Sequence, residues 1–213
     1  MDRSRPLPRE FGAYLVTDRH QTRGRPLADC VEAALRGGVR AVQLREKDVS
    51  TRDLADLARG LREVTARHGA ALLINDRIDV ALACDADGVH LPAGSFEVRD
   101  ARALVGAERF VGVSTHSPEE VVAAERAGAD FVVFGPVFDT PSKRPYGAPL
   151  GLHLLKQAAG PVSIPVFAIG GITTARLEDV RAAGAAGAAV IRAILAADDP
   201  HEAAREFVRG GGI

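Results

Sequence analysis

Eight short apolar runs alternate with segments of helical periodicity along almost the whole chain, and this alternation restricts the possible folds more than any other feature. The runs occupy residues 13–17, 39–44, 70–74, 88–91, 109–114, 131–134, 165–172 and 187–191. A short, continuously apolar run is typical of a strand buried on both faces, as in a parallel sheet. Helix signals separate the runs. Ser117 and Pro118, for example, form an N-cap followed by a proline in the first turn.

Repeated strand–helix units predict a parallel sheet, and eight of them favour closure into a (β/α)8 TIM barrel of the α/β class. The length of 213 residues lies at the short end for this fold. An open, doubly wound sheet is the alternative. We expect a single barrel domain over residues 11–209, with a flexible N-terminal tail at 1–10 and a flexible C-terminus at 210–213.

Composition excludes several classes of protein. The formal net charge is −1, so nothing general favours binding to nucleic acid or to an anionic membrane. No apolar run is long enough to cross a bilayer, and residues 1–10 lack the apolar core of a signal peptide. Cys30 and Cys84 lie in alanine-rich helical pattern and are interpreted as small buried hydrophobes. We therefore expect a cytoplasmic protein.

Polar residues gather at or just after the carboxyl ends of the predicted strands. In a barrel these ends share one mouth, where active sites lie. Several cations there predict a small anionic, phosphorylated ligand, and no His, Cys or carboxylate cluster has zinc-like spacing. The set consists of Arg45, Lys47, Asn75, Asp76, His90, Ser95, Ser114, His116, Thr140, Ser142 and Lys143.

A second feature predicts a phosphate site after the last two strands. Gly170 and Gly171 have no Cβ, so a ligand can approach their backbone N–H groups. The chain then passes from strand to helix at Ile191, which presents a helix N-terminus that attracts anions. The loops after strands seven and eight hold the common phosphate site of this fold. We expect Gly170, Gly171, Val190 and Ile191 to bind phosphate through their backbone.

Structural alternatives stay open for several of these residues. Either Arg45 or Lys47 could pair only with Glu46 between them. Asp76 could cap the helix that it precedes, and His90 is interpreted as a hydrogen-bonded core histidine. His116 could lie in a surface loop, and Lys143 in a mobile one. The long loop at 135–149 is either a functional lid or disordered.

Seven motifs in order resemble the thiamine phosphate synthase/TenI superfamily, whose fold is a (β/α)8 barrel. They are QLREK at 43–47, INDR at 74–77, GVHL at 88–91, GVSTH at 112–116, GPVFDTPSK at 135–143, AIGGI at 168–172 and AVIRAI at 189–194. The resemblance runs from about Tyr14 to Leu195, nearly the whole chain. It implies a homodimer and a small-molecule thiazole phosphate as the ligand.

The superfamily has two activities. The synthase joins a pyrimidine diphosphate to thiazole phosphate and needs Mg²⁺, whereas the TenI branch is a thiazole tautomerase without a metal. Ser95 stands where the synthase has a metal-binding aspartate, and a hydroxyl is a poor substitute at a hard cation. Arg192 departs from the serine that the superfamily often has. On this pattern we expect an isomerase of thiamine biosynthesis close to TenI, with no cofactor.

The resemblance assigns the single proton transfer of the tautomerase to His116. It assigns substrate binding to Arg45, Lys47, Asn75, Ser114, Thr140, Ser142 and Lys143 beside the phosphate site. The alternative is the synthase, with Mg²⁺ bound by Asp76. A third possibility is a non-catalytic protein that binds a phosphate ligand in a regulatory role.

Overall fold

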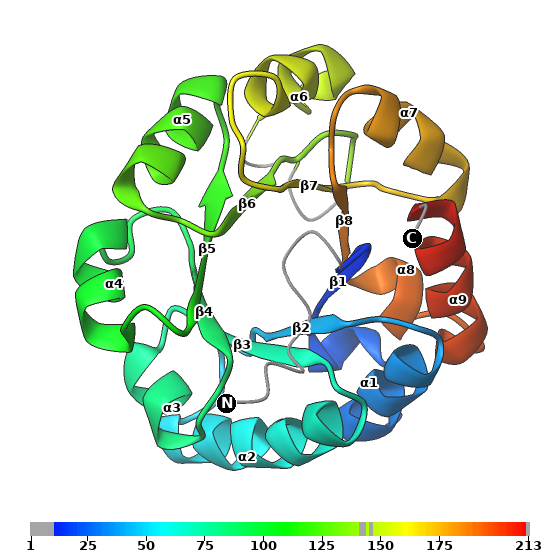
Figure 1. Cartoon of the computed structure of the whole chain (residues 1–213). Helices are drawn as coiled ribbons and strands as arrows, with labels where there is room; N and C mark the ends of the chain where they lie inside the picture. The colour runs from blue at the N-terminus through cyan, green and yellow to red at the C-terminus, as the bar shows by residue number, and fades with distance from the viewer. Residues whose placement is uncertain (1–10, 141–143, 145–146, 212–213) are drawn as a thin grey trace.

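The computed structural model describes residues 11–140, 144 and 147–211 and shows a closed barrel of parallel strands (Figure 1). Neighbours in sequence are neighbours in the barrel, and β1 pairs with β8 to close it. This confirms the TIM barrel and shows that the open-sheet alternative is wrong. The strands are β1 Ala13–Val16, β2 Ala41–Leu44, β3 Ala71–Asn75, β4 Gly88–Leu91, β5 Phe110–Thr115, β6 Phe131–Phe134, β7 Val166–Ile169 and β8 Gly187–Val190.

The helices form a ring around the barrel (Figure 1). They are α1 Leu27–Arg36, α2 Thr51–Arg67, α3 Ile78–Ala83, α4 Val98–Val105, α5 Pro118–Ala127, α6 Gly151–Ala159, α7 Leu177–Ala182, α8 Arg192–Leu195 and α9 Pro200–Gly211, with 3-10 turns η2 Arg19–Gln21 and η4 Thr174–Arg176. Ser117 caps α5 as predicted, since its side chain accepts a hydrogen bond from the Glu120 N–H. No helix in these ranges is both long and apolar enough to span a bilayer.

Alternation along the strands divides the core into two layers. One apolar layer lies between the strands and the helices and includes both cysteines. The other fills the barrel interior, where Phe11, Phe131 and Phe167 pack with ring centroids 5.8 to 6.1 Å apart. Phe11 precedes β1, so this aromatic plug occupies the amino end of the strands. The opposite, carboxyl end is left for polar side chains.

Two aspartates, of which Asp87 is buried and Asp130 half-buried, make the same pattern of hydrogen bonds beneath the barrel. Asp87, just before β4, accepts hydrogen bonds from the Leu72 N–H at 2.8 Å and from Arg62 Nη1 at 3.1 Å. Asp130, just before β6, accepts one from the Val111 N–H at 2.7 Å and one from Arg102. In both cases the aspartate ties its strand to the preceding strand and to the helix that leads into that strand. These contacts lie at the amino-terminal end of the strands, where residues of a TIM barrel contribute to stability and not to catalysis.

The chain ends in a helix that packs on the barrel. Helix α9 contacts α1, α7 and α8, and Gly37 makes room for it, because a Cβ there would lie 2.4 Å from the His201 carbonyl oxygen. The predicted C-terminal tail at 210–213 begins inside this helix, which runs to Gly211. Residues 212–213 and the predicted tail at 1–10 lie outside the described ranges.

Candidate active site

The carboxyl ends of the strands bring several predicted site residues to one mouth. Arg45, Asn75 and Ser114 follow the inward-facing alternation of β2, β3 and β5, and each is half-buried. Asn75 lies opposite His90 in the parallel register of β3 and β4. The Thr17 hydroxyl accepts a hydrogen bond from the Arg45 N–H at 2.9 Å and fixes the backbone there.

The carboxylate between Arg45 and Lys47 pairs with neither of them. Glu46 is buried and accepts hydrogen bonds from the Arg19 N–H at 3.1 and 3.2 Å and from Arg19 Nη1 at 3.1 Å. Arg19 also binds both carboxylate oxygens of Asp48, which holds the pKa of that carboxyl well below its usual range. Among the described residues, neither Arg45 nor Lys47 has an ion pair. The structure therefore leaves both cations for a ligand.

Asp76 does not cap the helix that follows it. Helix α3 begins without a side-chain cap, and Asp76 Oδ1 instead accepts a 2.5 Å hydrogen bond from the Ser95 hydroxyl. Asp76 adopts φ +65°, and its N–H is bonded to the His90 carbonyl at 2.9 Å. This backbone presents the carboxylate, exposed, at the rim of the mouth.

The donor set at Asp76 suits one kind of magnesium site. No group of three or more His, Cys, Asp or Glu side chains in the described ranges could enclose a metal. Mg²⁺, however, is commonly held by one or two carboxylates together with substrate phosphates and water. Asp76, with the Ser95 hydroxyl beside it, fits that mode and does not fit a site made by protein alone.

A cradle of backbone N–H groups lies after β7 and β8. Within the described residues, no protein acceptor bonds the N–H groups of Gly170, Gly171 or Ile191. The two glycines have φ +97° and +64°, a backbone region that favours glycine. Val190 lies inside β8, opposite Leu15, and is 4% exposed. The open part of the cradle therefore starts at Ile191, the N-cap of the short α8.

The glycines also admit the loop that follows β6. A Cβ on Gly170 would lie 2.6 Å from Pro136 Cβ, and one on Gly171 would lie 2.6 Å from the Asp139 carbonyl oxygen. The Phe138 N–H donates to the Gly170 carbonyl at 3.0 Å. The sequence predicted close approach of a ligand here; the structure adds close approach of this loop. Thr140 is half-buried in it, whereas Ser142 and Lys143 lie outside the described residues.

His116 lies at the rim and is exposed. Its Nδ1 is 2.6 Å from the Gly135 carbonyl oxygen, to which it donates, and its N–H donates to Glu120 Oε2 at 2.6 Å. In the neutral imidazole, the first bond corresponds to the Nδ1–H tautomer. His116 thus connects the end of β5 to the loop after β6.

A buried polar chain beneath the mouth includes two residues that the sequence did not single out. Gln43 Nε2 donates to the Tyr14 hydroxyl at 3.1 Å, Tyr14 lies 3.5 Å from His90 Nδ1, and His90 Nε2 is 2.9 Å from Ser114 Oγ. Burial, aided by the Arg45 charge, lowers the pKa of His90 to about 3. Burial also raises the pKa of Tyr14 well above its usual range. The core interpretation of His90 agrees with this burial.

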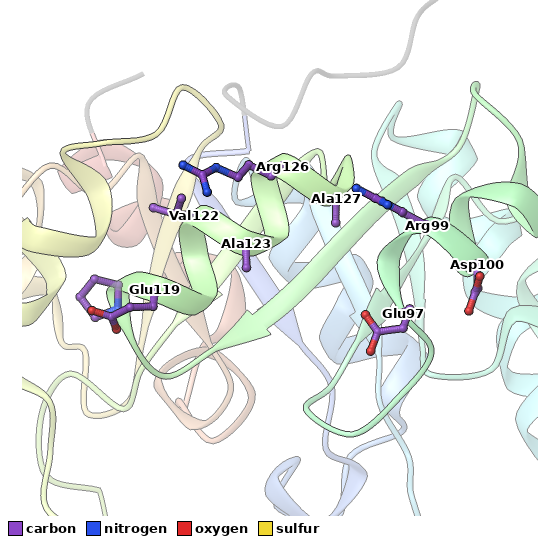
Figure 2. A pocket seen from close by; sticks show the side chains of 9 residues that line it. Glu97, Arg99, Asp100, Glu119, Val122, Ala123, Arg126 and Ala127 are labelled. Atoms are coloured by element: carbon purple, nitrogen blue, oxygen red, sulfur yellow. The ribbon is translucent and has the colours of Figure 1, made fainter.

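A surface hollow of about 820 Å³ lies on the outside of the barrel, between α4 and α5 (Figure 2). Charged side chains of both signs line it, among them Glu97, Arg99, Glu119 and Arg126. No strand end contributes to this hollow. It is therefore separate from the candidate site.

Comparison with known proteins identifies the family. The family model described as "Thiamine monophosphate synthase" matches residues 13–194. The chain belongs to the thiamine monophosphate synthase family. Membership in this family supports the prediction of an enzyme of thiamine biosynthesis.

Members of this family with similar sequences carry the name of the synthase. A Geobacter sulfurreducens protein, provisionally named a thiamine-phosphate synthase, is 54% identical over 199 residues, which cover 93% of each chain. The thiamine-phosphate synthase of Clostridium novyi is 46% identical, over 89% of this chain and 93% of its own. A solved thiamine phosphate pyrophosphorylase from Pyrococcus furiosus is 35% identical with a TM-score of 0.87, covering 95% of this chain and 96% of its own.

These relatives contradict the thiazole tautomerase predicted from the sequence, and nothing in them points to TenI or to an isomerase. The prediction depended on Ser95 in place of a carboxylate. It gave too little weight to Asp76, which remains at the rim with the Ser95 hydroxyl bonded to it. A site with Asp76 as its one carboxylate is compatible with a magnesium ion that substrate phosphates also bind.

Proposed function

We propose that this chain is a thiamine-phosphate synthase, a transferase that joins hydroxymethylpyrimidine diphosphate to thiazole phosphate and releases pyrophosphate. The names of the relatives support it, and one observation carries it: the mouth offers two separate anion sites. In the strand order β1 to β8, β3 and β7 are diametrically opposed. The free cations and Asp76 follow β2 and β3, and the N–H cradle follows β7 and β8.

The cradle suits the monoester of thiazole phosphate. Free N–H groups of Gly170, Gly171 and Ile191 can donate to phosphate oxygens, and the N-terminus of α8 adds its dipole. Val190 remains a predicted member of the cradle. A phosphate fixed there would direct the thiazole ring toward the centre of the mouth.

The side of the mouth after β2 and β3 suits the diphosphate. Arg45 can form paired, charge-assisted hydrogen bonds with phosphate oxygens, and Lys47 and Asn75 can add donors. The ring nitrogen of the thiazole forms a bond to the methylene carbon of the pyrimidine while the carbon–oxygen bond breaks. The electron pair of that bond leaves with pyrophosphate, so fixed positive charge on this side favours the transition state. Thr140, Ser142 and Lys143 remain predicted ligands of the same group.

Asp76 and the Ser95 hydroxyl would hold Mg²⁺ together with the diphosphate. Bound magnesium would supply further positive charge to the leaving group. The reaction needs no proton to be abstracted from either substrate. His116 therefore has no acid–base step in this proposal, and its bond to the Gly135 carbonyl gives it a structural role. The predicted homodimer remains a prediction.

The test is turnover of the purified chain with both substrates and magnesium. We expect thiamine phosphate and pyrophosphate to appear in equal amounts, and EDTA to stop the reaction. Asp76→Asn should lower the rate by about 10-fold to 100-fold at limiting magnesium, since the carboxylate charge is lost. Binding of thiazole phosphate without any turnover would contradict the proposal and favour the non-catalytic alternative.

A further inference from the structure

The polar chain inside the barrel ends at a residue of the mouth. It runs from Gln43 through Tyr14 and His90 to Ser114, through strands β2, β1, β4 and β5. The first three are between 0 and 2% exposed, and only Ser114 is half-buried. A buried polar group without a partner is costly, so every hydrogen in this chain needs an acceptor.

The hydrogen bonds of such a chain could all be donated in one direction or all in the other. The Gln43 amide selects one of these two polarities. The structure places Gln43 Nε2, a donor, against the Tyr14 hydroxyl. Because the Tyr14 oxygen accepts from Gln43, its own hydrogen goes to His90 Nδ1, its other neighbour. A neutral imidazole that accepts at Nδ1 carries its proton on Nε2. His90 therefore donates to the Ser114 hydroxyl oxygen at 2.9 Å.

This polarity decides what Ser114 offers to a ligand. With one lone pair of its oxygen engaged by His90, the hydroxyl hydrogen is available on the side of the mouth. We propose that His90, held by Tyr14 as its Nε2–H tautomer, is a positioning residue that makes Ser114 a hydrogen-bond donor to an acceptor atom of the bound heteroaromatic substrate. The kinetic part of this inference rests on the proposed synthase activity.

The packing around His90 holds its ring in this place. A Cβ on Gly112 of β5 would lie 2.8 Å from His90 Nδ1 and 2.4 Å from Phe131 Cζ, so only glycine leaves space for both rings. The centroid of the His90 ring lies 6.0 Å from that of Phe131 and 5.9 Å from that of Tyr14. A ring confined on these sides keeps its Nε2 directed at Ser114, which is the preorganisation that a positioning residue needs.

The first experiment needs no substrate. In ¹⁵N-histidine-labelled protein at neutral pH, the chemical shifts of the two His90 ring nitrogens distinguish the protonated from the unprotonated nitrogen, and His90→Gln assigns the signals. We expect protonation at Nε2 and, in Tyr14→Phe, a mixture of both tautomers. An Nδ1–H imidazole in the wild type would overturn the inference, because Ser114 would then donate to His90 and not to the ligand.

The second experiment separates positioning from packing by kinetics. We expect His90→Leu to lower kcat by about 10-fold to 100-fold with little change in KM for thiazole phosphate. His90→Gln keeps a donor near the same point and should recover most of the rate. Tyr14→Phe should give a smaller loss. Val133→Ala, which opens a cavity on the same inner face, is the control and should lower stability but not kcat.

The contradicting results of these experiments can be distinguished from one another. Equal kcat for His90→Leu, Val133→Ala and the wild type would overturn the positioning role. A loss in His90→Gln as large as that in His90→Leu would do the same, since the restored donor would then be irrelevant. A wild type that makes no thiamine phosphate would instead overturn the proposed function, and the tautomer measurement would still decide the polarity of the chain.

Discussion

At the scale of residues, the important feature of the mouth is which charged side chains already form ion pairs within the protein. Arg19 pairs with Glu46 and Asp48, the two carboxylates next to Arg45 and Lys47 in the sequence. A cation without an ion pair at a concave site loses little on binding an anion, because no existing pair has to be broken. This is the reason to assign the diphosphate to these two residues.

Arg45→Ala tests that assignment. Loss of a charge-assisted pair of hydrogen bonds should raise KM for the pyrimidine diphosphate by about 10-fold to 100-fold and leave KM for thiazole phosphate within about twofold. The matched control is Arg126→Ala, in the outer hollow of Figure 2, which should change neither value. Equal effects on both substrates would remove Arg45 from the diphosphate side.

His116→Ala separates the two chemistries of the superfamily. The synthase reaction has no proton transfer for His116, so kcat should stay within about fivefold of the wild type. Loss of the 2.6 Å bond to the Gly135 carbonyl should cost about 1 kcal/mol in the free energy of unfolding, measured with urea. A fall in kcat of about 1,000-fold or more would indicate acid–base catalysis and contradict the assigned reaction.

Sequence pattern found the residues at the ends of the strands but not those beneath them. Arg45, Asn75 and Ser114 were predictable because a polar residue after an apolar run marks the mouth of a barrel. Tyr14 and Gln43 lie within apolar runs, where they resemble core filling. Their hydrogen bonds cross the barrel interior between strands, so only closure of the barrel brings them to His90.

At the scale of elements, the cradle after β7 and β8 depends on the loop after β6. The Val137 N–H donates to the Ile169 carbonyl at 2.8 Å, and the Arg176 guanidinium lies 4.4 Å above the Phe138 ring. The two glycines therefore face both the ligand and the loop after β6. Their free N–H groups lie on the ligand side, and the loop occupies the space that side chains would fill. A change at either glycine should affect binding and loop packing together.

Gly171→Ala should show this coupling. Its φ of +64° strains an alanine, and the new Cβ would lie 2.6 Å from the Asp139 carbonyl oxygen. We expect a loss of about 2 kcal/mol in the free energy of unfolding and a rise of about 10-fold or more in KM for thiazole phosphate.

The control for that change is Gly128→Ala, at the C-cap of α5. Its φ is +97°, but nothing lies within 4 Å of the added Cβ. The variant should lose only the strain energy, about 1 kcal/mol, and should keep the KM of the wild type. If Gly128→Ala raised KM as much as Gly171→Ala, the rise would come from a general loss of stability and not from a change at the cradle.

The elements themselves were predictable because local signals agree with the tertiary fold. Strands β4 and β6 begin and end at the predicted residues, the first starting at a glycine and the second fully apolar. The chain after β8 was harder. Residues 203–208 fall inside the predicted domain, but only the packing of α9 on α1, α7 and α8 shows that they form its last helix.

At the scale of the whole molecule, long-range polar contacts hold the ring of units together. Arg25, in the loop between β1 and α1, donates to the carbonyl oxygens of Leu195 at 2.7 Å and Ala197 at 2.8 Å. It thereby links the first strand–helix unit to the last, beside α8. Beneath the barrel, Asp87 and Asp130 tie neighbouring units together in the same way.

Asp87→Ala should therefore destabilise the barrel without reaching the mouth. The buried Leu72 N–H and the partly buried Arg62 would both lose their acceptor, at a cost of about 2–4 kcal/mol in the free energy of unfolding. Asp56→Ala, which removes an exposed pair with Arg59 in α2, is the control and should cost less than about 1 kcal/mol. Equal losses in urea unfolding would contradict a buried clamp at Asp87.

The choice between two activities on one barrel could not be derived from the fold, because both use the same mouth. The prediction depended on Ser95 alone. How much a serine at this position weakens metal binding depends on how many of the metal ligands come from the substrate. That quantity belongs to the complex and not to the chain. The names of relatives that are similar over nearly the whole length favour the synthase.

The most direct measurement is a crystal structure of the protein with thiamine phosphate, pyrophosphate and magnesium. We expect the phosphate monoester on the N–H groups of Gly170, Gly171 and Ile191, and pyrophosphate at the separate site with Arg45, Lys47 and Asp76. Both anions at one of these two sites, or a monoester that touches none of these N–H groups, would contradict the proposed function.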